Sequence, residues 1–355
     1  MVLKKAYIRD LLNSSIINFI FKFCNFKNDG KILVKSMDGI GDILVRSKLA
    51  EKIIEKYGED NVYFLMKEHY KSLGEMLGYN VIGIPRKSEK NLFKRLKMMY
   101  QINKKYSPKK FLNIEFGNDS IVANICASEK IGRKDNYPTV QRYNKYYTKT
   151  FEFSKENKKV LENIRDIAKN ILNEKIELED IIPDLSKKFS KKEEGIVIAV
   201  GSTARDRVCS PKRMKEYILE LNKFYPNEEI ILVGNGELQK NYAQYLIQEL
   251  SQLKIKNFID KTTLKEAFQL VAGSKLFLGF ESGLYNFCFV TRKKGIALFK
   301  DINAPFAHEV PWLKIVGPEN EKIDNFYDEN YSDEKINNIS VKKFREAIEE
   351  LRWER

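Results

Sequence analysis

The most informative segment of this sequence is Ile32-Leu-Val-Lys-Ser-Met-Asp-Gly-Ile-Gly-Asp-Ile-Leu-Val45. Its first residues are β-branched and apolar and predict a buried strand, and a helix is expected to start at Asp42. Gly39 and Gly41 lie between the two elements, where they allow a tight turn and leave room for a ligand. Ligands of open α/β sheets bind at the carboxyl ends of the strands. The segment therefore predicts a ligand-binding turn at the edge of a parallel sheet.

The same turn limits what the protein can be. Its glycines do not complete the dinucleotide fingerprint G-x-G-x-x-G, because Leu44 stands at the third glycine position. This argues against a dehydrogenase. Asp42 keeps two interpretations at this point, since aspartate is also a common helix N-cap.

Outward from this segment, short apolar runs alternate with stretches of helical periodicity, which is typical of a parallel sheet with right-handed crossovers. In the first half we expect strands at 32–35, 62–66, 81–84 and 111–116, and helices at 43–56, 69–77 and 91–105. In the second half we expect strands at 196–200, 230–233, 258–259, 276–278 and 295–299, and helices at 212–224, 238–253, 264–272, 284–290 and 341–351.

The chain has 355 residues, more than one hydrophobic core usually supports, so two domains are expected. Residues 134–194 interrupt the alternation with a tyrosine-rich stretch, a charged helix near 155–173 and a lysine-glutamate run at 187–194. Such a run is usually a solvated connector, so the boundary is expected near 185–194. We predict an N-terminal amphipathic helix in residues 1–30, a Rossmann-like domain at 31–190 and a second one at 191–355.

The N-terminal helix is expected to cover residues 3–27. Its apolar residues recur at helical spacing, with lysines and arginines around them: Leu12, Ile16, Phe19 and Phe23. The helix either packs on its own domain or rests on an anionic membrane face. No signal peptide is evident, and the uncharged run 11–21 is too short to span a bilayer. We expect a cytoplasmic protein, free or peripheral at the inner membrane.

Charge and cysteine content narrow the classes further. The net charge is +14, from 63 Lys and Arg against 49 Asp and Glu, which favours partners that carry phosphate. The basic residues are spread along the chain without the blocks of a nucleic-acid platform, so no nucleic-acid partner is expected. The four cysteines form no CxxC pair and there are two histidines, so no zinc-site spacing occurs and reduced cysteines are indicated.

The second half has a basic turn between a strand and a helix, Gly201-Ser-Thr-Ala-Arg-Asp-Arg207. Ser210 and Pro211 follow, and they suit the cap and the first position of a helix. Small hydroxyl residues and arginines suit a diphosphate, because they offer hydrogen-bond donors and positive charge. The alternative is that the arginines are solvated at the surface. The candidate binding residues here are Gly201, Ser202, Arg205 and Arg207.

Two more turns of this kind follow later strands. One is Gly234-Asn-Gly-Glu237, and the other is Glu281-Ser-Gly-Leu284, where Ser282 and Gly283 open a helix. A helix start with free N–H groups is an anion site. Glu281 could accept hydrogen bonds from ribose or sugar hydroxyls, or it could cap the turn.

In their order along the chain, these segments resemble glycosyltransferase family 9, the ADP-heptose:lipopolysaccharide heptosyltransferases. The resemblance covers roughly residues 31–315. Each piece is loose, but the ordered set is fairly specific. The pieces are Gly41-Asp42, Gly201-Ser202 with Pro211, Gly234-Asn-Gly-Glu237, Thr263-Leu-Lys-Glu266, Glu281-Ser-Gly-Leu-Tyr-Asn286 and Leu298-Phe-Lys300.

The resemblance implies an α/β protein of GT-B fold, with two facing Rossmann-like domains, parallel sheets and an interdomain cleft. It implies an inverting glycosyltransferase that moves a heptose or related hexose to a hydroxyl of a cell-envelope glycan, such as lipopolysaccharide core. The nucleotide-sugar donor, with an ADP-sugar favoured, would bind mainly to the second domain, without an essential metal or other cofactor. Asp42 would be the general base on the acceptor-side loop with Gly39 and Gly41, and Ser282, Gly283 and Leu284 would hold the diphosphate.

The sequence departs from the family pattern at three places. The acidic residue before Ser-Gly is Glu281 rather than aspartate, and the family histidine is Asn286. The usual Lys-x-Trp-Pro is Val208-Cys-Ser-Pro211, so Arg205 or Arg207 would have to replace the missing lysine. Two alternatives of the same fold therefore stay open. They are a non-catalytic protein that binds nucleotide sugars or glycans, and a nucleotide-sugar epimerase.

Overall fold

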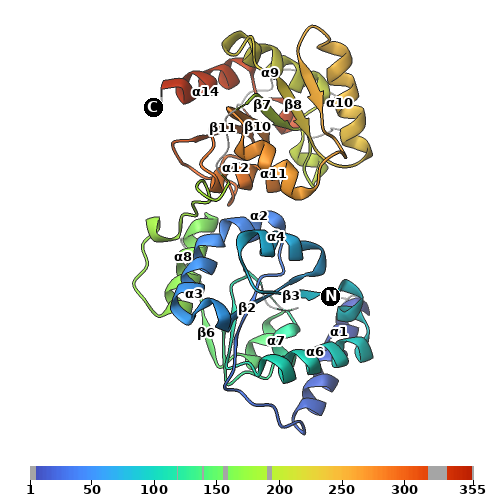
Figure 1. Cartoon of the computed structure of the whole chain (residues 1–355), viewed down its shortest axis with the longest axis vertical. Coiled ribbons are helices and arrows are strands. Elements are labelled where there is room, and N and C mark those ends of the chain that lie inside the picture. The colour runs from blue at the N-terminus through green and yellow to red at the C-terminus, as the bar shows by residue number, and fades with distance from the viewer. Residues whose placement is uncertain are drawn as a thin grey trace. The chain divides into compact units, whose positions relative to one another are not determined.

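The computed structural model describes residues 5–117, 119–137, 140–154, 159–189, 194–318 and 334–353 (Figure 1). The chain divides into two compact units. The first comprises Met1–Asn157 and Leu161–Ile182, and the second comprises Lys158–Val160 and Pro183–Arg355. Each unit is an α/β fold with a parallel sheet of six strands, which confirms the predicted fold class.

The first sheet has the order β3-β2-β1-β4-β5-β6, which is the strand order of a Rossmann fold. Its centre is buried, because β1 is flanked by β2 and β4 and Leu33 pairs with Tyr63 and Phe111. The strands are β1 (Ile32–Lys35), β2 (Val62–Lys67), β3 (Val81–Ile84), β4 (Lys110–Asn113), β5 (Glu129–Arg133) and β6 (Lys149–Phe151). The chain adds β2 and β3 on one side of β1, and then β4, β5 and β6 on the other side. In sheets of this order the ligand usually binds in the crevice between the carboxyl ends of β1 and β4.

Helices lie on both faces of this sheet (Figure 1). They are α1 (Lys5–Phe21), α2 (Ile40–Val45), α3 (Ser47–Tyr57), α4 (Lys71–Leu77), α5 (Arg86–Lys90), α6 (Leu92–Tyr106), α7 (Ile121–Asn124) and α8 (Val160–Leu172). The single helix predicted at 43–56 is wrong, because the chain leaves the helical conformation at Arg46. The strands β5 and β6 were not predicted, since they are short and rich in charged and polar residues.

The second sheet has the order β12-β11-β10-β7-β8-β9, which repeats the first topology. Here β10 is buried along its length between β7 and β11. The strands are β7 (Ile196–Ala199), β8 (Ile230–Val233), β9 (Ile255–Asn257), β10 (Leu276–Phe280), β11 (Gly295–Leu298) and β12 (Leu313–Val316). The strand predicted at 258–259 is placed too late, because β9 ends at Asn257, although the Phe258 N–H still donates to the Leu232 carbonyl of β8 at 2.9 Å.

The helices of the second unit start close to the predicted positions. Ser210 caps α9, its side chain accepting a hydrogen bond from the Arg213 N–H at 3.2 Å, and Pro211 is the first helical residue. Thr263 and Glu266 form a capping box at α11. The helices are α9 (Pro211–Phe224), α10 (Glu237–Glu249), α11 (Leu264–Ala272), α12 (Gly283–Val290), α13 (Glu334–Asn337) and α14 (Val341–Trp353).

The boundary between the units lies earlier than the predicted position near 185–194. The Leu185 N–H donates to the Val290 carbonyl at 2.7 Å, and the Phe189 ring packs edge-on against Phe287 at 5.0 Å. These contacts place residues 183–189 in the second unit. The predicted division at residues 190 and 191 lies outside the described residues.

The N-terminal helix is part of the first unit rather than a separate element at 1–30. It ends at Phe21, and Ile17 and Phe21 lie in the same hydrophobic core as Leu33 and Phe111. Its predicted apolar stripe, by contrast, is exposed: Leu12, Ile16, Phe19 and Phe23. The start of the predicted helix, residues 3 and 4, lies outside the described residues. Within the described ranges, no helix combines the length and apolar character that crossing a bilayer requires.

Two phenylalanines test this packing, because Phe21 is 5% exposed and Phe23 is 78% exposed. Phe21→Ala should lower the free energy of unfolding by about 3 kcal/mol, since it leaves a cavity in the core. Phe23→Ala should change it by less than about 0.5 kcal/mol. Urea denaturation followed by circular dichroism measures both. Equal effects of the two substitutions would contradict a helix packed through Phe21.

Candidate functional site

Asp42 lies in the first turn of α2, directly after the loop that follows β1. The helix begins at Ile40, so Gly39 is the N-cap and Asp42 is the third helical residue rather than the cap. The Asp42 carboxylate accepts a hydrogen bond from the Gly39 N–H at 3.2 Å. This bond uses one oxygen, and the side chain remains 26% exposed. Asp42 therefore stabilises the turn and still presents a carboxylate to solvent.

A buried arginine holds Asp42 and a second carboxylate together. One terminal nitrogen of Arg46, Nη2, lies 2.5 Å from Asp38 Oδ2 and 3.6 Å from Asp42 Oδ1. The other nitrogens of Arg46 bind the carbonyls of Asp42 and Ile114. Burial and the nearby Asp38 raise the pKa of Asp42, and Arg46 and the Gly39 N–H oppose this rise. A raised pKa makes Asp42 a stronger base in its ionised form.

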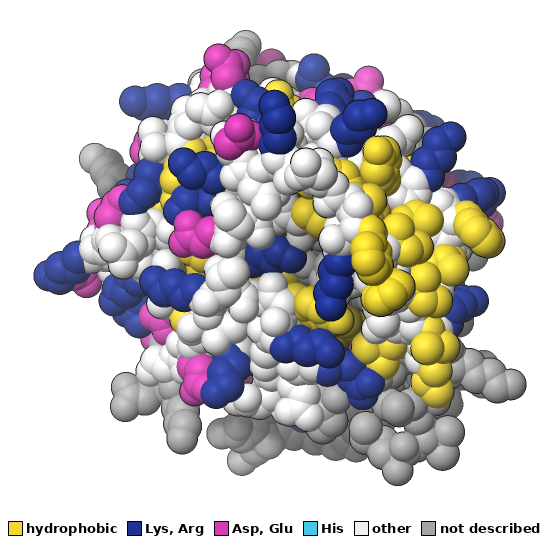
Figure 2. All heavy atoms as spheres, turned by 90° about the horizontal axis from the view of Figure 1, so that it is seen from below, with side chains coloured by type: hydrophobic (Ala, Val, Ile, Leu, Met, Phe, Trp, Pro, Cys, Tyr) yellow, Lys and Arg dark blue, Asp and Glu magenta, His cyan; other side chains and the backbone are white. Residues whose placement is uncertain are grey.

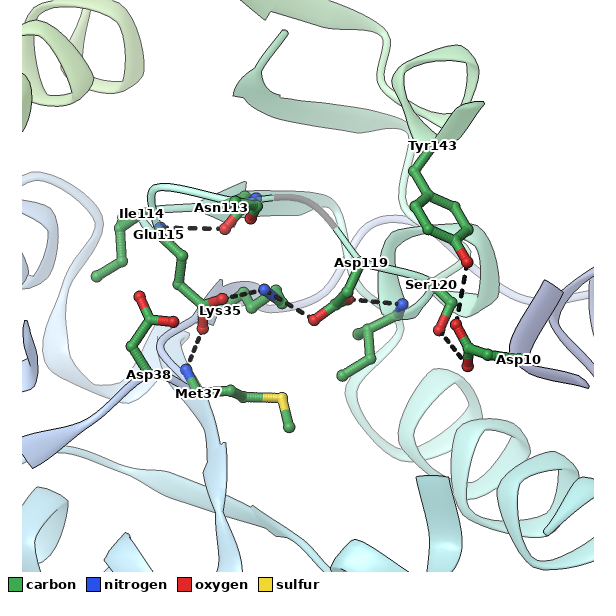
Figure 3. Close-up of polar contacts among 12 residues, drawn as sticks. Asp10, Lys35, Met37, Asp38, Asn113, Ile114, Glu115, Asp119, Ser120 and Tyr143 are labelled. Atoms are coloured by element: carbon green, nitrogen blue, oxygen red, sulfur yellow. Dashed lines mark hydrogen bonds and ion pairs between the residues drawn. The ribbon is translucent and has the colours of Figure 1, made fainter. Parts of the chain in front are cut away.

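Behind this turn lies a buried ion pair that sequence reasoning missed. Lys35, the last residue of β1, binds Glu115 and lies 2.9 Å from Asp119 (Figure 3). Glu115 also accepts a hydrogen bond from the Met37 N–H. Burial lowers the pKa of Lys35, but Asp119 and Glu115 outweigh it and raise the pKa overall, so the ammonium stays charged. The loop after β4 is thereby joined to the loop after β1.

Two signals in the sequence could have indicated this pair. Lys35 ends an otherwise apolar strand, where a charged side chain requires a partner. Glu115 and Asp119 follow β4, and carboxyl ends of neighbouring parallel strands meet at one edge. The order of the strands was needed to connect the two observations.

In the second unit the turns after β7 and β10 contact each other. The Ser202 hydroxyl donates to the Glu281 carbonyl at 2.7 Å, and the Arg207 Nη1 lies 3.1 Å from Glu281 Oε1. These turns are neighbours because β7 pairs with β10. Burial raises the pKa of Glu281, and Arg207 opposes the rise. Arg207 and Glu281 were expected to act on different parts of a ligand, whereas here they bind each other.

The helix start after β10 has the predicted form. Ser282 is the N-cap of α12, and its hydroxyl accepts a hydrogen bond from the Tyr285 N–H at 3.4 Å. Gly283 and Leu284 are the first two helical residues, so their N–H groups have no partner within the helix. Asn286, at the position of the family histidine, lies 3.2 Å from the buried His308. This pairing, which joins two distant segments, was not predicted.

The remaining candidates are placed around the same sheet edge. A Cβ at Gly201 would lie 2.4 Å from the Gln239 side chain, and Gly234 faces the same side chain. Glu237 is exposed and lies 3.4 Å from Lys240, away from the contact between Arg207 and Glu281. Arg205 is exposed and has no ion-pair partner among the residues that the structure describes. Lys300, after β11, pairs with Asp206 of the basic turn.

Comparisons with known proteins support this architecture. Neither a family model nor a curated protein sequence matches the chain. Among solved structures, heptosyltransferase WaaC of E. coli with ADP-2-deoxy-2-fluoro heptose gives a TM-score of 0.70 at 14% identity, covering 90% of this chain and 99% of the other. A glycosyltransferase of family 9 from Veillonella parvula gives 0.68 at 13% identity, covering 92% and 98%.

A nucleotide-sugar enzyme of another class is also similar. A putative UDP-N-acetylglucosamine 2-epimerase of Listeria monocytogenes gives a TM-score of 0.51 at 12% identity, covering 81% of this chain and 84% of the other. The similarity to the transferases is closer and extends over more of both chains. The chain therefore has a GT-B fold and is similar in structure to the heptosyltransferases of glycosyltransferase family 9.

Proposed function

We propose that this protein is an inverting glycosyltransferase that uses a nucleotide-sugar donor, with an ADP-sugar favoured. The sugar is a heptose or related hexose, and the acceptor is a hydroxyl of a cell-envelope glycan such as lipopolysaccharide core. The observation that most supports this proposal is the position of Asp42. It is a half-buried carboxylate of raised pKa that follows β1, in a fold similar to that of heptosyltransferases.

The chemistry divides between the two units. In the first unit, Asp42 takes the proton of the acceptor hydroxyl while the oxygen of that hydroxyl bonds to the anomeric carbon of the donor. The bond from that carbon to the diphosphate breaks, and the nucleoside diphosphate leaves with the electron pair. In the second unit, the N–H groups at the start of α12 and the arginines of the basic turn stabilise this negative charge.

Asp42→Asn tests the base. The amide oxygen still accepts the Gly39 N–H bond, so the fold should remain while turnover falls by roughly a hundredfold or more. Release of ADP from an ADP-sugar in the presence of acceptor measures turnover, and Glu51→Gln on α3 is the control. An early-melting variant with unchanged specific activity would contradict the base role. Epimerisation of the sugar without release of nucleoside diphosphate would support the epimerase alternative.

The donor site is tested by Arg207→Ala and Glu281→Gln. Loss of Arg207 should weaken the binding of pyrophosphate, of ADP and of ADP-sugar alike by about 1.5–3 kcal/mol, the range for a lost charged hydrogen bond. Glu281→Gln removes a carboxylate that neutralises Arg207, so pyrophosphate affinity should stay equal or improve. Calorimetric titration measures both, with Arg292→Ala as the control because Arg292 pairs with Asp184. Unchanged affinity in Arg207→Ala would leave Arg205 as the phosphate-binding arginine.

We also propose that the first unit binds the surface of an anionic membrane through α1 and α6. The exposed apolar residues of α1, of the segment that follows it and of α6 form what we call the α1–α6 surface: Ile8, Leu12, Ile16, Phe19, Ile20, Phe23, Phe93 and Tyr100. Phe26 packs against both helices, with its ring 5.2 Å from that of Phe21 on α1 and 5.5 Å from that of Tyr100 on α6. Figure 2 shows this apolar patch with lysines and arginines beside it. Exposed basic residues on the same segments are Arg9, Lys22, Lys27, Lys94 and Lys97.

The combination of apolar and basic side chains on the α1–α6 surface indicates which partner binds it. An apolar surface flanked by cations gains both from burial of the apolar side chains and from attraction to anionic headgroups. A protein partner would have to match a particular shape, whereas a lipid surface needs only the two chemistries. The membrane is therefore the partner that this surface fits.

Phe19→Ser with Phe23→Ser should lower binding to phosphatidylglycerol-containing vesicles by roughly tenfold or more, because the buried apolar area is lost. Co-sedimentation with the vesicles measures this binding. Ile302→Ser, at an exposed apolar residue of the second unit, is the control. Point substitutions are preferable to deletion of the helix, since Ile17 and Phe21 belong to the core. Equal binding of the double variant and the wild type would contradict the proposal.

A further inference from the structure

The start of α12 is connected to a buried side chain from the loop between β11 and β12, His308. Its Nε2 lies 3.2 Å from Oδ1 of Asn286, and Nδ2 of Asn286 donates to the Ser282 carbonyl at 2.9 Å. The two side chains are 3% and 4% exposed, so water does not compete for these bonds. An unbroken series of hydrogen bonds therefore runs from His308 to the N-cap of α12.

The direction of each bond in this series follows from the groups that it joins. A carbonyl can only accept, so the Asn286 side chain donates to Ser282 through Nδ2, and its Oδ1 faces His308. A neutral imidazole donates from one ring nitrogen, and Nε2 must be that nitrogen for the pair to bond. Burial, together with the nearby Lys159, lowers the pKa of His308 to about 3, so the ring is neutral near pH 7. His308 therefore donates to Asn286 and fixes the orientation of its amide.

The ring of His308 is itself held in place by α12. It stacks on Phe289 with the ring centroids 3.8 Å apart and on Tyr285 with the centroids 5.7 Å apart. The Tyr285 hydroxyl accepts a hydrogen bond from the His308 N–H at 3.1 Å and donates to the Phe306 carbonyl at 2.8 Å. His308 is thus a donor whose position is fixed by several contacts, which is what a residue that orients another side chain requires.

The bond to the Ser282 carbonyl matters because of peptide geometry. The C=O of Ser282 and the N–H of Gly283 belong to one planar trans peptide, so they point in opposite directions. The carbonyl accepts from both the side chain and the backbone N–H of Asn286, the latter at 3.2 Å. The Gly283 N–H, which has no partner within the helix, is thereby directed outward from the start of α12.

We propose that His308 is a positioning residue of the donor site. It acts through Asn286 and orients the peptide between Ser282 and Gly283, so that the Gly283 N–H meets the leaving diphosphate. The basic turn supplies positive charge to the same ligand, whereas His308 supplies orientation alone. The choice of a diphosphate as the ligand rests on the proposed transferase function.

Two substitutions separate the hydrogen bond of His308 from its packing. His308→Phe keeps an aromatic ring against Phe289 and Tyr285 but cannot donate to Asn286, and it should weaken pyrophosphate and ADP binding by about three- to tenfold. His308→Gln loses the stacking but keeps an N–H donor, so its affinities should stay within about twofold of the wild type, even with a lower melting temperature. Calorimetric titration with pyrophosphate and with ADP measures the affinities. The control is His69→Phe in the first unit.

Asn286→Leu tests the route by which His308 acts. It removes the amide at similar volume, so it should weaken pyrophosphate binding by the same factor as His308→Phe. Adding His308→Phe to this variant should then cause no further loss, because two residues of one series are not additive.

The opposite order, with weaker binding in His308→Gln than in His308→Phe, means that the ring acts by packing alone and overturns the inference. Equal affinities of the wild type, His308→Phe and Asn286→Leu also overturn it, and release of ADP from an ADP-sugar by the same proteins then leaves the transferase proposal standing. A wild type that binds neither pyrophosphate nor ADP overturns it as well.

The expected order of affinities in a protein that releases no ADP from ADP-sugars supports the inference and counts against the transferase. Circular dichroism shows whether each variant is folded. Where His308→Phe is not folded, Asn286→Leu decides alone, and an unchanged affinity of that variant for pyrophosphate overturns the inference.

Discussion

The buried ion pair of Lys35 with Glu115 joins the two strand ends on which the first unit's chemistry depends. Glu115 binds the Lys35 ammonium and the Met37 N–H, so the loop after β4 holds the loop after β1 in place. Removing one partner of a buried pair typically costs about 3–5 kcal/mol, because a charge is left without compensation. The conformation of the turn that carries Asp38 and Asp42 follows from this contact.

The two units share one strand order but carry different side chains at the strand ends that this order brings together. In each sheet the first strand of the unit pairs with the fourth, so the turns after those two strands lie side by side. In the first unit this brings together carboxylates, which accept hydrogen bonds and protons. In the second it brings together hydroxyl, guanidinium and helix N-terminal groups, which suit an anion. The different residues at equivalent edges are the basis for the division between an acceptor side and a donor side that we propose.

The first helix serves both the fold and a surface. Ile17 and Phe21 face the core, and Asp10 binds Arg95. The exposed apolar residues on its other sides cost solubility without contributing to the core. A helix used only for packing would carry polar residues at those positions, which is why a membrane surface is the partner that we propose.

The alternation of strands and helices, the Rossmann-like repeat and the cap at Ser210 could be predicted from the sequence, because periodicity and capping are local properties of the chain. The individual positions of Asp42, Ser282 and Gly283 at strand-to-helix turns could be predicted for the same reason. The contacts among such residues could not. Lys35 meets Glu115 across 80 residues, and Ser202 meets Glu281 across 79. Such pairs depend on which strands are neighbours, and that order is set by the packing of the whole sheet, so only the tertiary structure decides them.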